Sequence, residues 1–218
     1  LLSRRQRQMC IRDRLITMAR IIECVPNCSE GRDKEIIEYI ADAVRSVPGV
    51  ALMDYSSDEN HNRSVYTIVG DPDQMGEAAF RFAKACVEKI DMTKHHGEHP
   101  RMGAVDVIPF TPVKDVSMEE CIELSKKVAQ RIWEELKMPV TLYEESASAP
   151  HRRNLAAIRK GQFEGMPEKL QDPKWYPDYG NHEIHPTAGI VAVGARFPLV
   201  AFNINLSTSD VEIANKIA

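Results

Sequence analysis

The sequence predicts an α+β protein, most simply a ferredoxin-like sandwich in which one sheet is covered by helices on one face. The segments expected as strands and helices follow the order β-α-β-β-α-β-α-β, and the two consecutive strands argue against a doubly wound sheet. The 218 residues are 43% hydrophobic and 28% charged, which is ordinary for a globular chain with a packed core.

Five short segments have the apolar and β-branched composition that is typical of strands. The third alternates Val65, Thr67 and Val69, which indicates one buried and one exposed face. The fourth contains prolines, which are typical of an irregular or edge strand. The five predicted strands cover residues 20–25, 50–55, 63–69, 104–113 and 139–144.

Helices are predicted where apolar residues recur every three to four positions. Asp33 is a suitable N-cap for the first helix, which ends before Pro48-Gly49. Ser117 and Glu120 form a capping box that opens the third helix. The predicted helices cover residues 34–46, 73–90, 117–136 and a short segment, 152–160.

The composition changes after the short helix. Residues 165–186 are rich in Pro, Gly, Asp and aromatic residues, so we expect a long irregular segment of the kind that carries function or joins domains. Strands at 190–195 and 199–206 are expected to form a hairpin, and Asp210 is expected to cap a last helix. Because that helix has no C-cap and the hairpin has little sheet to join, we expect a second, incomplete α/β unit to begin near Gly180.

Residues 1–17 differ from the rest of the chain. They hold five arginines and one acidic residue, and they lack the apolar stretch of a secretory signal. An organelle transit peptide has a similar composition, but we prefer a non-native or disordered leader with Met18 as the native start. The expected domains are therefore a leader at 1–17, an N-terminal unit at 18–179 and the beginning of a second unit at 180–218.

Charge and composition exclude several classes of protein. A net charge of −4 argues against non-specific binding of nucleic acid. The sequence has no apolar run long enough to span a bilayer. The five cysteines form no Cys-x-x-Cys pair, so reduced thiols in a cytoplasmic protein are expected rather than a disulfide or zinc scaffold.

The segment between the second helix and the fourth strand is the main candidate for chemistry. It contains His95, His96 and His99, with Glu98 and Arg101 beside them, and its glycine and proline favour a loop. Histidine titrates near neutrality, so it can take and return a proton in one cycle. A solvated polar loop and a zinc site are the alternatives, although the helical spacing that aims two imidazoles at one ion is missing.

Two other places are candidates for binding. Asn62 and Arg63 follow a polar loop and can bind a carboxylate or an amide, or they can be an ordinary strand-edge pair. The stretch 178–189 combines glycines, aromatic residues and two histidines at the expected domain junction, where ligand pockets are common. A plain linker is the other interpretation of that stretch.

Taken together, these motifs resemble the formiminotransferase domain of the glutamate formiminotransferase family, from about residue 18 to residue 218. The matching text is Glu23-Cys24-Val25-Pro26-Asn27, Ser29-Glu30-Gly31, Asn62-Arg63, Asp91-Met92, HHGEHPRMGAVDVIPFTPV at 95–113, Trp175, Pro177-Asp178, Gly189 and Ala201 to Leu206.

The resemblance implies transfer of the formimino group from N-formimino-L-glutamate to N5 of tetrahydrofolate in histidine degradation. It further implies two α/β subdomains with the folate between them, a homodimer, and a folate that can be polyglutamylated. We expect a cytoplasmic protein with no metal, membrane or nucleic-acid partner, as the residue spacing, hydropathy and charge indicate. His99 is implied as the catalytic residue, with Glu98, Arg101, Asn62 and Arg63 in support. The folate-binding stretch maps onto Gly180, Asn181, His182, Glu183, Ile184, His185, Pro186, Thr187, Ala188 and Gly189.

A mechanism follows from this resemblance. One imidazole, His99, can remove the N5 proton from the addition intermediate and pass it to the departing glutamate nitrogen. Arg101 or Arg63 is expected to clamp a substrate carboxylate. The alternatives are another folate one-carbon transferase acting on formylglutamate or 5-formyltetrahydrofolate, an RNA-binding module of ferredoxin-like fold, and a metallohydrolase.

Overall fold

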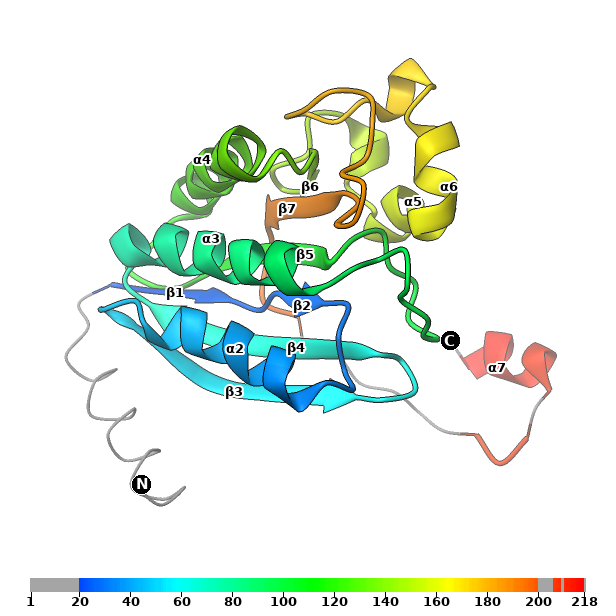
Figure 1. The fold of residues 1–218 in the computed structure, drawn as a ribbon, viewed down its shortest axis with the longest axis horizontal. Coiled ribbons are helices and arrows are strands. Elements are labelled where there is room, and N and C mark those ends of the chain that lie inside the picture. Colours follow the sequence, from blue (N-terminus) through cyan, green and yellow to red (C-terminus); the bar gives the residue numbers. More distant parts are fainter. Residues whose placement is uncertain (1–19, 200–205, 209, 218) are drawn as a thin grey trace.

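The computed structural model describes residues 20–199, 206–208 and 210–217, and it contains one mixed sheet with helices packed against it (Figure 1). The predicted α+β class is confirmed. Within the described ranges the sheet has seven strands. These are β1 (Ile21–Cys24), β2 (Asn27–Cys28), β3 (Val50–Asp58), β4 (Arg63–Gly70), β5 (Val105–Lys114), β6 (Val140–Glu144) and β7 (Val191–Ala195).

The sheet combines antiparallel and parallel pairing. β1 and β2 follow each other between β4 and β5, and each pairs antiparallel with both neighbours. β3 pairs antiparallel with the other side of β4. Beyond β5 the sheet continues with β7 and then β6, both in parallel pairing. A central antiparallel part therefore carries a parallel extension at one side.

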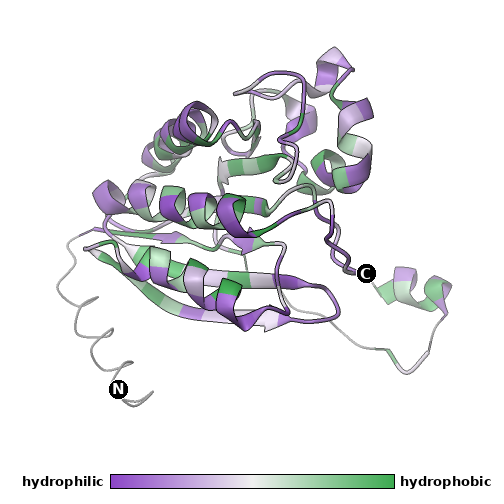
Figure 2. Cartoon of the chain, viewed as in Figure 1, coloured by the Kyte–Doolittle hydropathy of each residue, from purple (hydrophilic) through white to green (hydrophobic). Residues whose placement is uncertain are grey.

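Three long helices, α2 (Lys34–Arg45), α3 (Pro72–Lys89) and α4 (Met118–Leu136), lie next to one another and cover one face of the sheet (Figure 1). The predicted caps are confirmed at Asp33, which accepts two backbone N–H groups, and at Ser117, which forms the capping box. In Figure 2 these helices alternate between hydrophilic and hydrophobic residues, whereas β7 is mostly hydrophobic. This distribution places the main core between the helices and the sheet.

A second, smaller core lies on the opposite face, at the β5–β7–β6 end of the sheet. Val107 and Ala192 point into it, while their neighbours Ile108 and Val193 point into the main core. The helices α5 (Leu155–Arg159) and α6 (Gln162–Lys169) cover this face (Figure 1). The buried members of the second core are Met102, Val107, Tyr143, Ile158, Met166, Leu170, Ile190 and Ala192.

Two predictions around this core need correction. The single helix expected at 152–160 is a 3-10 turn, η1 (Pro150–Arg152), followed by α5. A new helix begins after η1 because Asn154 is an N-cap, whose side chain accepts the N–H groups of Ala156 and Ala157.

The segment expected to be irregular at 165–186 also holds regular structure. It begins inside α6 and contains a 3-10 turn, η2 (Pro173–Trp175). Met166 is buried on α6, and Leu170 follows it as the buried C-cap residue. The helix contains a proline and only one buried residue, so its sequence lacks the apolar repeat every three to four positions that would have predicted it.

The C-terminal prediction is partly outside the described residues. The expected strand at 190–195 is β7, but it pairs with β5 and β6 rather than in a hairpin. The expected strand at 199–206 falls largely on residues 200–205, outside the described part. The last predicted helix is confirmed as α7 (Val211–Ile217), and the Asp210 carboxylate accepts the N–H of Glu212 at 2.8 Å.

Candidate active site

The histidine-rich segment is a loop, as predicted, that joins α3 to β5 and packs against the turn between β3 and β4. The loop buries two of its histidines, His95 and His99. His96 and Glu98 are exposed. A Cβ atom at Gly97 would lie 2.4 Å from the backbone oxygen of His61, so only glycine allows this close approach.

Asn62 holds the loop in place. Its backbone has a φ of 48°, in the left-handed region that asparagine tolerates better than most residues. Its side-chain oxygen accepts the N–H of Gly31 at 2.9 Å, and its amide donates to the backbone oxygen of His96 at 3.0 Å. The Asn62 side chain, predicted to bind a substrate carboxylate or amide, is thus engaged in holding the loop.

Both ring nitrogens of His95 are occupied. Nε2 lies 2.9 Å from the backbone oxygen of Asn62, to which it donates, and Nδ1 accepts from Arg101 Nε at 3.2 Å. Burial lowers the pKa of His95 below its ordinary value, and the Arg101 charge acts in the same direction. His95 is thus held as a neutral imidazole with no nitrogen free for a substrate.

Arg101 is 5% exposed and fully engaged. Its guanidinium makes a two-point ion pair with the Glu164 carboxylate, at 2.6 and 2.8 Å, and donates to Gln162 at 2.8 Å. Both partners belong to α6, so this arginine fastens the loop to the helix that covers the second core.

Arg63 differs from Arg101, which is paired with Glu164, because the Arg63 side chain has no hydrogen bond or ion pair with any described residue and its Nε is buried without a partner. Tyr66 and Ile68 point into the main core, so the alternation along β4 places Arg63 on the opposite face. That is the face on which α5 and α6 lie. Arg152 and Arg196 also have a buried Nε without a partner, but Arg152 makes an ion pair with Asp178, whereas the guanidinium of Arg63 is available to an anionic ligand.

His99 is 8% exposed and contacts a carboxylate that is completely buried. Its Nε2 lies 3.4 Å from Asp106 Oδ2, and no described group bonds to its Nδ1. Asp106 is also bound by Arg159 of α5, whose Nε donates to Oδ1 at 3.3 Å while a terminal nitrogen pairs with Oδ2. His99 is therefore anchored at one nitrogen and open at the other.

The stretch 180–189 lies directly beside the histidine loop. The N–H of Met92 donates to Thr187 at 2.8 Å, and the N–H of Ala104 donates to Ala188 at 2.8 Å, so both ends of the loop bind this stretch. Gly189 adopts a φ of +73°, and a Cβ there would lie 2.3 Å from the backbone oxygen of Met102. The two segments predicted to bear function are therefore joined by backbone contacts.

Side chains within this stretch follow two patterns. His182 stacks on Tyr176 with 3.5 Å between ring centroids, and it is exposed. His185 accepts the N–H groups of Thr187 and Ala188 on Nδ1, and burial lowers its pKa. His185 thus shapes the turn, while His182 presents a flat aromatic surface to solvent.

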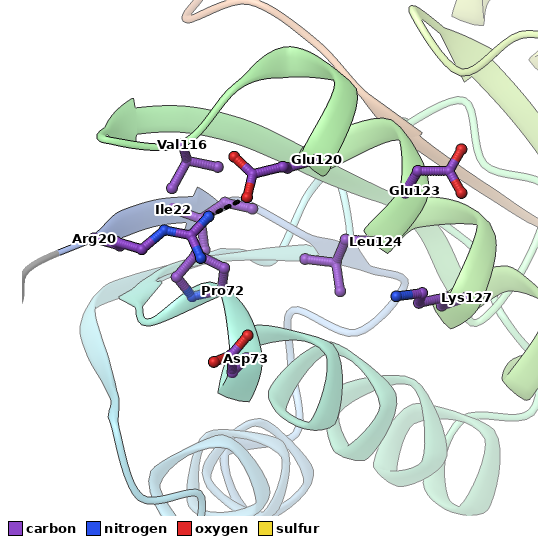
Figure 3. Close-up of a pocket in the computed structure, with 9 residues that line it drawn as sticks. All are labelled: Arg20, Ile22, Pro72, Asp73, Val116, Glu120, Glu123, Leu124 and Lys127. Atoms are coloured by element: carbon purple, nitrogen blue, oxygen red, sulfur yellow. Dashed lines mark hydrogen bonds and ion pairs between the residues drawn. The ribbon is translucent and has the colours of Figure 1, made fainter.

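A small pocket of about 180 Å³ lies elsewhere, at the N-terminal ends of α3 and α4 (Figure 3). Ile22 and Leu124 supply apolar walls, and Arg20 pairs with Glu120 across its mouth. None of the predicted site residues lines it, so it does not belong to the candidate active site.

Two features are absent from the residues that the structure describes. No three His, Cys, Asp or Glu side chains in that part converge in a way that would hold a metal ion. Within 20–199, 206–208 and 210–217, no helix has the length and apolar character needed to cross a membrane.

Asp106 and Arg159 are site residues that the sequence motifs do not indicate. One signal was available for Asp106, because a carboxylate in the middle of an apolar strand needs a partner. Nothing local marks Arg159, which reaches Asp106 from 53 positions along the chain.

Comparison with known proteins assigns the sequence to a family. Residues 21–196 match the model of the formiminotransferase domain, N-terminal subdomain, a range that includes the histidine loop, the stretch 180–189 and β7. The chain belongs to the formiminotransferase family. The predicted family resemblance is confirmed.

Named relatives agree with this assignment. Glutamate formimidoyltransferase of Streptococcus pyogenes serotype M1 is 61% identical over 201 residues, which are 92% of this chain and 67% of that protein. Glutamate formimidoyltransferase of Thermoplasma acidophilum is 48% identical over 91% of this chain and 66% of its own length. Formimidoyltransferase-cyclodeaminase of Mus musculus is 49% identical over 92% of this chain, which spans 37% of that protein.

Proposed function

We propose that this protein transfers the formimino group from N-formimino-L-glutamate to N5 of tetrahydrofolate, with glutamate and 5-formiminotetrahydrofolate as products. Family membership gives the reaction class, and relatives carry the name glutamate formimidoyltransferase. The observation that carries the proposal is His99, a buried imidazole with Nε2 against a carboxylate and Nδ1 unengaged.

The chemistry needs one proton to move within the addition intermediate. N5 of the folate attacks the carbon of the protonated formimino group, a bond forms between N5 and that carbon, and the π electrons move onto the terminal nitrogen. N5 then carries a proton and a positive charge. His99 takes this proton and delivers it to the glutamate nitrogen. The carbon–nitrogen bond to glutamate breaks and its electrons leave with the amine, while the lone pair of the terminal nitrogen re-forms the C=N bond of the formimino group, which is now bonded to N5 of the folate.

Arg63 is the proposed clamp for a substrate carboxylate. It has a buried, unpartnered Nε and lies on the same face of the sheet as α5, whereas Arg101 is already paired with Glu164. A guanidinium that gains a carboxylate partner makes charge-assisted hydrogen bonds, which are stronger than neutral ones. We assign Arg101 and Asn62 to positioning of the loop, and exposed Glu98 to neutralising the cationic intermediate.

Tetrahydrofolate is the proposed co-substrate, and the stretch from Gly180 to Gly189 is its proposed contact. Support comes from the backbone bonds of Thr187 and Ala188 to the two ends of the histidine loop. The exposed His182–Tyr176 stack offers a flat surface of the kind on which an aromatic ring packs. A folate bound there would lie next to the segment that holds His99.

Several finer features of the architecture are also proposed. β1, α2, β3, β4, α3 and β5 form a ferredoxin-like unit, supported by the antiparallel strand order β3, β4, β1, β5. The boundary of the N-terminal unit is better placed after residue 196 than at 179, because β7 pairs between β5 and β6 and the family match ends there. A cytoplasmic homodimer remains a prediction that fractionation and light scattering would test.

The direct test is an assay of group transfer by the full-length protein with alternative donors. We expect turnover with formiminoglutamate and tetrahydrofolate, and little with formylglutamate or 5-formyltetrahydrofolate. Chelator treatment should leave the rate unchanged, because the proposed step uses only side-chain proton transfer. A preference for a formyl donor would assign the site to a different one-carbon transfer, and no transfer from any donor would refute the proposal.

A further inference from the structure

Asp106 is an ionisable residue in an unusual place. It is 0% exposed and lies in β5, between Val105 of the main core and Val107 of the second core. Burying a carboxylate is costly unless it is paired and hydrogen-bonded. The two groups that meet this requirement are the guanidinium of Arg159 and the imidazole of His99.

A β-bulge directs Asp106 toward those partners. In the pairing of β2 with β5, Asn27 lies opposite Val107 and Cys28 lies opposite Val105, with a register shift between them. Asp106 is therefore the extra residue of the strand. Bulges of this kind change the direction of a side chain, and they are common next to active sites.

Arg159 is itself held firmly, although α5 is a five-residue helix. The helix is capped at its start by Asn154. At its end, Lys169 Nζ donates to the backbone oxygens of Ala157 and Ile158 at 2.7 and 2.6 Å, and to that of Lys160 at 3.0 Å. Both ends of α5 are thus satisfied, and the guanidinium is fixed over the Asp106 carboxylate.

We propose that Asp106, held in turn by Arg159, is a positioning residue that fixes the tautomer of His99. Asp106 accepts the Nε2–H of the imidazole, which leaves Nδ1 as the nitrogen that takes the N5 proton and returns it to the leaving amine. Because Arg159 already balances the charge of Asp106, the carboxylate orients the imidazole and does not take its proton. This proposal rests on the proposed function for its catalytic consequence, although the tautomer itself can be observed without substrate.

The first test is the ring tautomer of His99 in the full-length protein labelled with ¹⁵N-histidine. Long-range ¹⁵N–¹H correlation, with His99→Gln used to assign the signal, should show the proton on Nε2. Asp106→Asn should disturb this tautomer, because the amide can present an N–H in place of the carboxylate oxygen. A proton on Nδ1 in the unsubstituted protein would overturn the proposal, whatever the outcome of the transfer assay.

The second test uses kinetics. Asp106→Asn should lower kcat by roughly 10²-fold or more, while the KM for formiminoglutamate changes by less than about threefold, since loss of an orienting carboxylate affects proton transfer rather than binding. Arg159→Gln should also lower kcat, and Arg159→Lys should recover part of the loss. Glu77→Gln is the control. Glu77 pairs with Arg81 of α3 and Arg131 of α4, away from Asp106, so this substitution should leave kcat unchanged.

The two tests separate the possible failures. If the unsubstituted protein shows no formimino transfer, the proposed function fails, and the tautomer still decides the role of Asp106. If Asp106→Asn folds and keeps both the tautomer and kcat, the positioning role is refuted. If Asp106→Asn does not fold, the tautomer of the unsubstituted protein and the recovery from Arg159→Gln to Arg159→Lys decide the question.

Discussion

His95 and His99 lie four positions apart in one loop and have nearly the same exposure, 7% and 8%. Their partners differ. His95 donates to a backbone oxygen and accepts from Arg101, so both nitrogens are used inside the protein. Among the described residues, His99 bonds only to the Asp106 carboxylate, and its Nδ1 is unengaged. Hydrogen-bond partners, rather than residue type or burial, therefore separate a histidine that holds a loop from one that can transfer a proton.

The largest expected effect is on turnover at His99. His99→Ala should lower kcat by roughly 10²–10⁴-fold, the range that a positioned general acid–base usually contributes. The KM values for both substrates should change little, because the imidazole is proposed to move a proton and not to bind a carboxylate. Steady-state kinetics on folded protein measure this. Turnover like that of the unsubstituted protein would remove His99 from the mechanism.

The second effect separates the two arginines. Arg63→Gln should raise the apparent KM for formiminoglutamate or tetrahydrofolate by roughly 10–100-fold, which corresponds to the loss of a charged hydrogen bond. Arg101→Gln is the comparison, and it should lower stability, because Glu164 and His95 lose their buried partner. Unchanged KM values in Arg63→Gln would argue against the clamp.

The third effect concerns stability at His95. His95→Ala leaves the Asn62 carbonyl and the Arg101 Nε without their partner, which should reduce the free energy of unfolding by about 1–3 kcal/mol. Turnover per folded molecule should fall far less than in His99→Ala. Chemical denaturation followed by circular dichroism measures the first quantity. A variant with full stability and lost turnover would reverse the assignment of the two histidines.

The smallest effect is the pH dependence of stability. Burial lowers the pKa of His95 and of His185 below 6.5, so below that pH the unfolded chain binds more protons than the folded protein. The free energy of unfolding should therefore fall as the pH drops from 7.5 toward 5.5. His95→Gln should show a shallower fall than the unsubstituted protein in denaturation at several pH values. Identical slopes would show that His95 does not contribute.

Local chemistry explains which parts of the fold were predictable. Asp33 and the Ser117–Glu120 capping box are contained within a few residues, and both caps form as expected. The glycine and proline of the histidine segment likewise made a loop predictable. The pairing of β7 between β5 and β6 was not predictable in this way, because it depends on contacts between distant segments.

The candidate site shows the same limit. The sequence indicated that His99 lies in a loop with catalytic side chains. The position of its partner Asp106, however, depends on a β-bulge and on an arginine 53 positions away. The sequence suggested that Arg101 binds a substrate carboxylate, because its actual partner Glu164 lies 63 positions away and is not recognisable from the sequence. Roles that depend on such long-range partners cannot be assigned from residue type and spacing alone.

Chemical rescue tests the central claim most directly, namely that His99 and not His95 transfers the proton. His99→Gly and His95→Gly each remove one imidazole, and free imidazole can then be added to either variant during the transfer assay. We expect the turnover of His99→Gly to be low and to rise with imidazole concentration, while that of His95→Gly does not respond. Turnover in His99→Gly equal to that of the unsubstituted protein, or rescue of His95→Gly instead, would contradict the claim.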